Sequence, residues 1–183
     1  MRITGGELGG RNLKVPKSDL IRPTQDRVRE ALFNSLQFEL VGKDFLDLFA
    51  GSGAVGIEAL SRGAKSATFV EQDRRHLAVL KDNLSAFALS SATVISADVY
   101  RYLANYAGAG FDFVFADPPY ALGEAKGYAP VLATLAERGV VRVGGLFLAE
   151  MTSAQKTEEA PGWTLTRERT YGKTRLAFYR RNI

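Results

Sequence analysis

Four residues, Asp117-Pro118-Pro119-Tyr120, have the types and order that point most specifically to chemistry. They follow residues 111–116, a nearly continuous apolar run that predicts a strand covered on both faces. In open α/β sheets, ligands bind beyond the carboxyl ends of the strands, and this segment lies at such an end. The two prolines make the turn rigid and lack N–H groups, so their carbonyls remain free to accept hydrogen bonds.

Methylation of a planar amino group is the reaction that these residues suit. The lone pair of an exocyclic base NH2 is delocalised into the ring, so the nitrogen is a poor nucleophile. Hydrogen bonds to Asp117 and to the Pro118 carbonyl would hold the nitrogen pyramidal, with its lone pair facing a methyl donor. Tyr120 can stack on the base, which is worth roughly 1–3 kcal/mol. The candidate catalytic residues are therefore Asp117, Pro118, Pro119 and Tyr120.

A glycine-rich loop forms the candidate cofactor site. Residues 51–56, Gly-Ser-Gly-Ala-Val-Gly, have the G-x-G-x-x-G spacing, in which glycines allow a tight turn, close approach of a ligand and close helix–strand packing. This spacing alone fits NAD, FAD and S-adenosylmethionine equally well. Asp47 favours S-adenosylmethionine, because a carboxylate here would repel a dinucleotide pyrophosphate but would suit an α-ammonium group.

Two further acids follow predicted strands. Glu71 lies 20 positions after Gly51, where an acid accepts hydrogen bonds from ribose hydroxyls. Asp98 can accept a hydrogen bond from an adenine amino group, with the Val99 N–H at the ring edge, and it equally suits the N-cap of the next helix. The cofactor-binding candidates from these segments are Asp47, Ala50, Gly51, Ser52, Gly53, Glu71, Gln72, Asp98 and Val99.

Strands and helices alternate along most of the chain, which predicts a parallel sheet with helices on both faces. The predicted strands are 45–49, 67–70, 93–96, 111–116 and 146–151, and the predicted helices are 25–39, 54–62, 74–87, 99–106 and 124–138. Residues 163–170 and 174–180 alternate without a helix between them, so we expect an antiparallel hairpin. Residues 1–4 and 11–15 predict a second, small hairpin around glycines. We expect one domain, 1–183, with a basic hairpin and loop at 1–23 and the core at 24–183.

Composition excludes several classes of protein. The chain is 46% hydrophobic and 24% charged, as in soluble proteins, and no apolar run approaches the roughly 18 residues that span a bilayer. With no signal-peptide pattern at the N-terminus, we expect a cytoplasmic protein without a membrane partner. The absence of cysteine excludes disulfides, thiolate metal sites and covalent methylation of pyrimidine C5. His76, the single histidine, is interpreted as a solvated surface residue, and no metal is expected.

Positive charge is concentrated at both ends. Residues 1–30 carry a net charge of +3 and residues 161–183 carry +5, which leaves the centre acidic within a total of +4. A polyanionic partner such as RNA would be attracted to the ends. The candidate RNA-binding residues are Arg2, Arg11, Lys14, Arg27, Lys173 and Arg175.

Taken together, these segments resemble the bacterial small-subunit (16S) ribosomal RNA guanine-N2 methyltransferases. The most specific match is residues 22–34, Arg-Pro-Thr-Gln-Asp-Arg-Val-Arg-Glu-Ala-Leu-Phe-Asn, and residues 47–53, 117–120, 3–6 and 171–176 also match. Gln25 stands where this family would have a threonine.

The resemblance implies a Rossmann-like class I methyltransferase, with a mostly parallel seven-stranded sheet whose final antiparallel hairpin lies at one edge. It implies that S-adenosylmethionine donates a methyl group to N2 of one guanine in 16S rRNA or in a small-subunit assembly particle. It also places Arg22 and Thr24 near the cofactor, and Arg27 near the cofactor or the RNA.

Other functions remain open at this point. The Asp-Pro-Pro-Tyr segment also serves DNA adenine-N6 and protein glutamine-N5 methyltransferases. An NAD-dependent oxidoreductase lacks an evident proton donor in this sequence, and a non-catalytic ribosome-assembly factor could keep the same fold. We expect a monomer.

Overall fold

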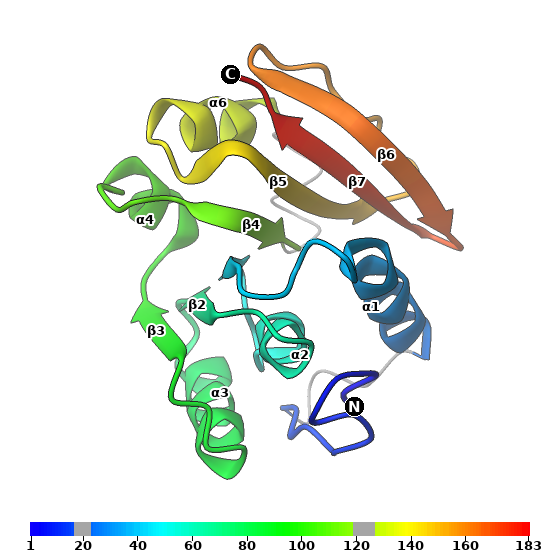
Figure 1. The fold of residues 1–183 in the computed structure, drawn as a ribbon, viewed down its shortest axis with the longest axis vertical. Coiled ribbons are helices and arrows are strands. Elements are labelled where there is room, and N and C mark those ends of the chain that lie inside the picture. Colours follow the sequence, from blue (N-terminus) through cyan, green and yellow to red (C-terminus); the bar gives the residue numbers. More distant parts are fainter. Residues whose placement is uncertain (17–22, 119–126) are drawn as a thin grey trace.

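The computed structural model describes residues 1–16, 23–118 and 127–183, with residues 23–25 described by their backbone alone (Figure 1). The strands are β1 (Asp44–Leu48), β2 (Ser66–Glu71), β3 (Ala92–Ser96), β4 (Phe111–Ala116), β5 (Val141–Thr152), β6 (Trp163–Tyr171) and β7 (Thr174–Arg181). The helices are α1 (Pro23–Leu36), α2 (Ala54–Ser61), α3 (Arg74–Ala86), α4 (Val99–Ala104) and α6 (Ala129–Glu137). Among the described helices, none is long and apolar enough to cross a membrane.

All the strands form one seven-stranded sheet in the order β3-β2-β1-β4-β5-β7-β6. The first five strands pair in parallel, whereas β7 is antiparallel to β5 and β6 is antiparallel to β7. The order reverses between β1 and β4, and such a switch point is where open α/β sheets bind their ligands. The predicted fold class, a mostly parallel seven-stranded sheet with an antiparallel hairpin at one edge, is confirmed.

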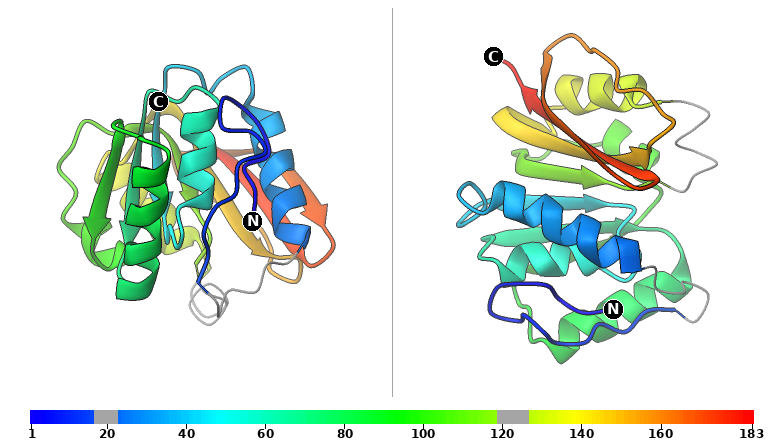
Figure 2. Two further views of the ribbon diagram at one scale, coloured as in Figure 1. Left: turned by 90° about the horizontal axis from the view of Figure 1, so that it is seen from below. Right: turned by 90° about the vertical axis from the view of Figure 1, so that its right-hand side faces the viewer.

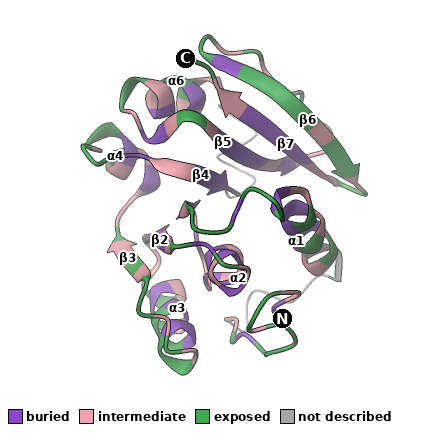
Figure 3. Cartoon of the chain, viewed as in Figure 1, coloured by how far each residue is buried: buried purple, intermediate pink, exposed green. Residues whose placement is uncertain are grey.

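The sheet is covered by helices on both faces (Figure 2). One core cluster joins α1, α2, α3 and the N-terminal hairpin to the sheet, and the other joins α4 and α6 to the opposite face. In α1, Val28, Leu32 and Leu36 are buried at four-residue spacing, which gives the helix a single apolar stripe. The edge strand β6 is exposed along most of its length (Figure 3).

Three predicted elements differ from the structure by three or more residues at one end. β5 begins at Val141, before the predicted residue 146, because the strand continues through Gly144-Gly145 with an irregular register opposite β4. α6 begins at Ala129 rather than Glu124: Gly127 has φ +59 and Pro130 lies at the helix start, while residues 124–126 lie outside the described part of the chain. α1 begins at Pro23 and ends at Leu36, three residues before the predicted end.

The N-terminal hairpin is confirmed as a short antiparallel bridge between Arg2 and Asn12. Ile3 and Leu13 are 1% and 4% exposed, since both pack into the cluster that contains α1 and α2. The hairpin is thus part of the core and not an appendage on the surface.

A buried ionic network joins this hairpin to two helices. Glu58 of α2 is fully buried, and its carboxylate accepts hydrogen bonds from Arg29 Nε at 2.6 Å and Arg62 Nη2 at 2.9 Å. The Thr4 backbone N–H and hydroxyl also donate to Glu58, while Arg29 donates to the Arg2 carbonyl and to Asp26 at 3.0 Å. One carboxylate therefore fixes α1, α2 and the hairpin relative to one another.

The Glu58→Gln variant should be less stable by roughly 3 kcal/mol, because two guanidinium groups lose their anionic partner in a low-dielectric environment. Urea unfolding measures this change. The matched control is Asp82→Asn, which removes the exposed Lys14–Asp82 pair and should change stability by less than about 1 kcal/mol. Equal effects of the two substitutions would show that the buried network does not hold these elements together.

Candidate active site

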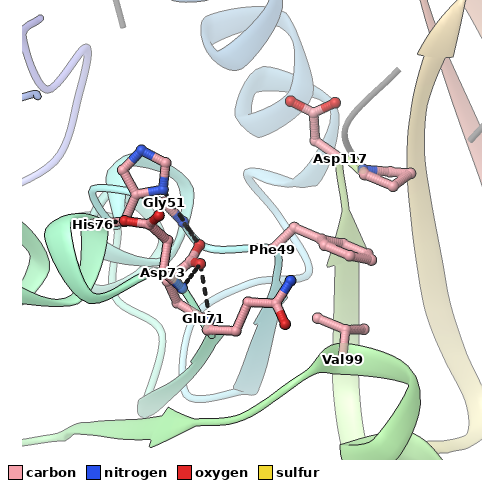
Figure 4. A pocket seen from close by; sticks show the side chains of 9 residues that line it. Phe49, Gly51, Glu71, Asp73, His76, Val99 and Asp117 are labelled. Atoms are coloured by element: carbon pink, nitrogen blue, oxygen red, sulfur yellow. Dashed lines mark hydrogen bonds and ion pairs between the residues drawn. The ribbon is translucent and has the colours of Figure 1, made fainter. Parts of the chain in front are cut away.

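The candidate site lies at the carboxyl edge of the parallel strands. A pocket of about 340 Å³ is lined by residues that follow β1, β2 and β4 and by the start of α4 (Figure 4). A second pocket, of about 220 Å³, lies between the sheet, α1 and the N-terminal hairpin. Phe49, Gly51 and Asp117 line both pockets, so the two are neighbours and together reach the size of ordinary ligand sites.

The glycine loop connects β1 to α2. Gly51 and Gly53 have φ of +54° and +85°, a conformation that favours glycine. A side chain on Gly56 would meet the Phe69 ring of β2 at 2.3 Å, which confirms the predicted close packing of helix on strand. At Gly53 the space is taken by Leu80 of α3, so close approach of a ligand there stays a prediction.

Glu71 braces the glycine loop from the end of β2. Its Oε2 accepts a hydrogen bond from Gly51 N at 2.8 Å, and its Oε1 accepts from Gln72 N at 2.7 Å and Asp73 N at 2.8 Å (Figure 4). The sequence indicated a ribose-binding acid here, and Glu71 does line the first pocket. Its hydrogen bond to the glycine loop is an additional role that the sequence spacing did not reveal.

Asp47 is a buried carboxylate, with 1% of its surface exposed. Its Oδ2 accepts a hydrogen bond from Gly56 N at 2.8 Å, at the start of α2. Burial, with the nearby charges of Asp117 and Glu71, raises the pKa of Asp47 to about 7 despite this bond. A carboxylate this poorly solvated favours a cationic ligand in the pocket that it lines.

Asp117 lies at the end of β4, where the two pockets meet. Asp117 is exposed to solvent, yet the surrounding protein atoms partly desolvate its carboxylate and raise the pKa of Asp117 to about 6. Pro118 lines the first pocket beside it. Pro119 and Tyr120 lie outside the described residues, so their predicted roles rest on the sequence.

Phe49 has the left-handed conformation that bulky residues rarely adopt, with φ +60°. Its ring packs edge-on against Tyr100, with 6.1 Å between ring centroids. Such strain persists where the surrounding structure fixes it, commonly at ligand sites. Phe49 was missed in the sequence because its type carries no functional signal; only its place between Asp47 and the glycine loop marks it.

The remaining cofactor-binding candidates differ in where they lie relative to the two pockets. Gln72 and Val99 line the first pocket, while Ala50 and Ser52 line the second. Asp98 Oδ1 accepts a hydrogen bond from Arg101 N at 2.9 Å, which confirms its N-cap role and leaves adenine binding as a prediction. Arg22 and the Thr24 side chain lie outside what the structure describes.

His76 is partly exposed at the wall of the first pocket, and so is less solvated than the sequence suggested. It lines the first pocket, its side chain is 26% exposed, and its Nδ1 lies 4.0 Å from Glu71 Oε2. Asp73 caps α3 by accepting hydrogen bonds from the N–H groups of Arg75 and His76, and this first turn of the helix lies at the edge of the pocket. The spacing of Asp73 three residues before His76 could have indicated in the sequence that His76 lies in the first turn of a helix.

The candidate RNA-binding residues separate into two groups. Arg2, Arg27 and Lys173 are exposed, as are Arg11 and Lys14, whereas Arg175 is partly buried. Lys14 pairs with Asp82 at 3.2 Å, Arg11 stacks 4.5 Å above the Phe87 ring, and Arg175 donates to the Gln155 and Ser153 carbonyls. Arg11, Lys14 and Arg175 therefore already have partners within the protein. Within the described residues, no His, Cys, Asp and Glu side chains are grouped so as to hold a metal ion.

Comparison with known proteins gives relatives along the whole chain. The family described as conserved hypothetical protein 95 matches residues 1–180. Ribosomal RNA small subunit methyltransferase D of Escherichia coli strain K12 is 38% identical over 182 residues, covering 99% of this chain and 90% of that protein. The protein of the same name from Haemophilus influenzae is 37% identical over 182 residues, covering 98% and 93%.

A solved structure supports the same assignment. It is described as "Putative methyltransferase yhhF from Escherichia coli", is 35% identical, covers 100% of this chain and 98% of that one, and has a TM-score of 0.89. The chain therefore belongs to the family of ribosomal RNA small subunit methyltransferase D and is a methyltransferase.

Proposed function

We propose that this enzyme transfers a methyl group from S-adenosylmethionine to the exocyclic N2 of a guanine in small-subunit (16S) ribosomal RNA. The observation that carries the proposal is the position of Asp117. It lies where the pocket built on the glycine loop meets a second pocket on the α1 side of the sheet. A carboxylate at this junction can contact both a methyl donor and an amino group.

The two pockets suit the two ends of S-adenosylmethionine. The first pocket offers Glu71 for ribose hydroxyls and Val99 for the adenine edge. The second offers Asp47, buried and short of solvent, for the α-ammonium group. Phe49 lies between them and can contact the sulfur region. The cofactor carries a net positive charge, and the carboxylates at this edge complement it.

When bound, the cofactor supplies an electrophilic methyl group on a cationic sulfur and departs as a neutral thioether. The enzyme's part is to position the amine and to take its proton. Asp117 and the Pro118 carbonyl accept hydrogen bonds from the amino group, so that its lone pair points at the methyl carbon. The new N–C bond forms as the C–S bond breaks, and a proton leaves the amine. Asp117 can receive that proton, since its raised pKa makes it a stronger base than an ordinary carboxylate.

The RNA target is supported by the relatives and by charge. Two relatives are named as methyltransferases of small-subunit ribosomal RNA. The basic ends of the chain, with Arg2, Arg27 and Lys173 exposed, favour a polyanion. We infer that the enzyme acts in the cytoplasm as a monomer, on the rRNA or on an assembling subunit. A guanine stacked in RNA must be unstacked to reach the pocket, which costs a few kcal/mol.

Mass spectrometry of ribosomal RNA nucleosides tests the reaction. In a strain that lacks the gene, small-subunit rRNA should lose one N2-methylguanosine, and the wild-type gene should restore it. Asp117→Asn should restore little of it, because an amide neither accepts the proton nor complements the cationic cofactor. We expect at least about a 100-fold loss of kcat/KM, or about 3 kcal/mol.

Two results would contradict this proposal. An unchanged nucleoside profile in the deletion strain would rule out the rRNA substrate. Loss of N6-methyladenosine or of methylated protein glutamine, with N2-methylguanosine intact, would favour the alternative amino-methyltransferases. Full activity of Asp117→Asn would remove Asp117 from the reaction.

The Asp47→Asn variant should be more stable than the wild type at pH 8 and should bind S-adenosylmethionine at least tenfold more weakly. Folding raises the pKa of Asp47 from an ordinary value of 3.8 to about 7, so its contribution to stability is greatest below pH 4 and is lost as the pH rises through 7. Asparagine keeps the shape and the acceptor for Gly56 without ionising. The gain should reach a few kcal/mol at pH 8 and shrink toward pH 5.

Asp44, in the same strand, provides the control. Burial opposes its ionisation, but hydrogen bonds from Ser66 and Arg142 lower its pKa below the ordinary value. Asp44→Asn should therefore destabilise the protein at neutral pH, with the loss vanishing as the pH falls below about 4. Thermal unfolding across pH 3–8 measures both variants. If the difference in stability between Asp47→Asn and the wild type did not change with pH, burial would not raise the pKa of Asp47 as described.

A further inference from the structure

Glu150 lies beside Asp117 although the two are 33 positions apart in the sequence. β4 and β5 are parallel neighbours in which Ala116 pairs with Ala149. Both alanines belong to the core cluster on the α4 and α6 face. Since side chains alternate along a strand, the next residues, Asp117 and Glu150, project to the opposite face, on which α1 lies. Both line the second pocket and a small recess next to it.

The Glu150 backbone is fixed, while its carboxylate is available. The Tyr128 hydroxyl donates to the Glu150 carbonyl at 2.7 Å. Within the described part of the chain, no hydrogen bond to the Glu150 carboxylate is found. Arg29 is close enough to act on it electrostatically, but its guanidinium is bonded to Glu58 and Asp26. Burial and the charge of Asp117 raise the pKa of Glu150, as expected for a carboxylate that accepts no hydrogen bond from the described residues.

Asp117 and Glu150 therefore give this wall of the pocket two neighbouring carboxylates, which act only as acceptors when they are ionised. Among the amino-bearing bases, guanine places a second donor, N1–H, next to its amino group. Adenine and cytosine place a ring nitrogen that accepts, N1 or N3, in the same position. An acceptor facing another acceptor leaves both unpaired when water is excluded, which strongly disfavours the wrong base.

We propose that Glu150 determines the choice of base, by accepting a hydrogen bond from guanine N1–H while Asp117 holds the N2 amino group. This inference rests on the proposed function and adds a reason for guanine to be the substrate. It also explains an otherwise unfavourable arrangement, in which two carboxylates share a partly desolvated pocket. The N1–H and N2–H donors of one guanine would satisfy both.

The test compares guanine with 2-aminopurine, which keeps the 2-amino group but has an accepting N1. Once the methylated guanine has been mapped, the same RNA is made with 2-aminopurine at that position. The wild type should favour guanine by at least about 100-fold in kcat/KM. Glu150→Gln can donate its amide N–H to the accepting N1, so the preference should fall below about tenfold, with faster methylation of 2-aminopurine. Glu150→Ala should lose activity on guanine without that gain.

Two controls separate fold and function from specificity. Glu39→Gln removes an exposed carboxylate that pairs with Arg180 at 3.1 Å, and it should keep the wild-type preference. The affinity for S-adenosylmethionine and the thermal unfolding of each Glu150 variant show whether the variant is folded. Should Glu150→Gln be folded and retain the wild-type preference, Glu150 does not read the base. Should the wild type methylate no guanine in any rRNA, the proposed function itself fails.

Discussion

Desolvated carboxylates at the carboxyl edge of one sheet are the constraint on which the rest of the structure depends. Asp47, Asp117 and Glu150 come from β1, β4 and β5 and line one pocket, with Glu71 nearby at the end of β2. Like charges in a low dielectric repel one another and raise each other's pKa. In the free protein they are costly, and a cationic cofactor with an amino-group substrate relieves that cost. The same groups thus lower the stability of the protein and, in the proposed function, select its ligands.

The surrounding structure holds these carboxylates in place. Glu71 and Asp47 each bond backbone N–H groups of the glycine loop or the start of α2, so the loop is fixed before any ligand binds. The Glu58 network fixes α1 and the N-terminal hairpin, which form the other wall of the second pocket. A pre-organised site of this kind loses little free energy to reorganisation during the reaction. The N-terminal hairpin is consequently part of the core, and its exposed Arg2 is available to the RNA in the proposed function.

The sequence predicted the sheet, the glycine loop, Asp47, Glu71 and Asp117, because each lies at a strand end marked by an apolar run and a turn. It did not reveal Glu150, which lies inside a predicted strand. Its position beside Asp117 is evident only once β5 is known to pair with β4. Nor did the sequence single out Arg29 and Glu58, because their burial as an ion pair depends on two helices that are far apart in the chain. Periodicity and motifs report local structure, and these residues depend on tertiary neighbours.

The number of protons released when S-adenosylmethionine binds tests the electrostatic account most directly. Calorimetric titrations in buffers of different ionisation enthalpy give this number. Asp47 and Asp117 have pKa values of about 7 and about 6 in the free protein, so both are partly protonated at pH 6.5. A bound cation lowers these pKa values, and we predict proton release at pH 6.5 that disappears by pH 9. A binding enthalpy that is the same in every buffer at pH 6.5 would contradict the account.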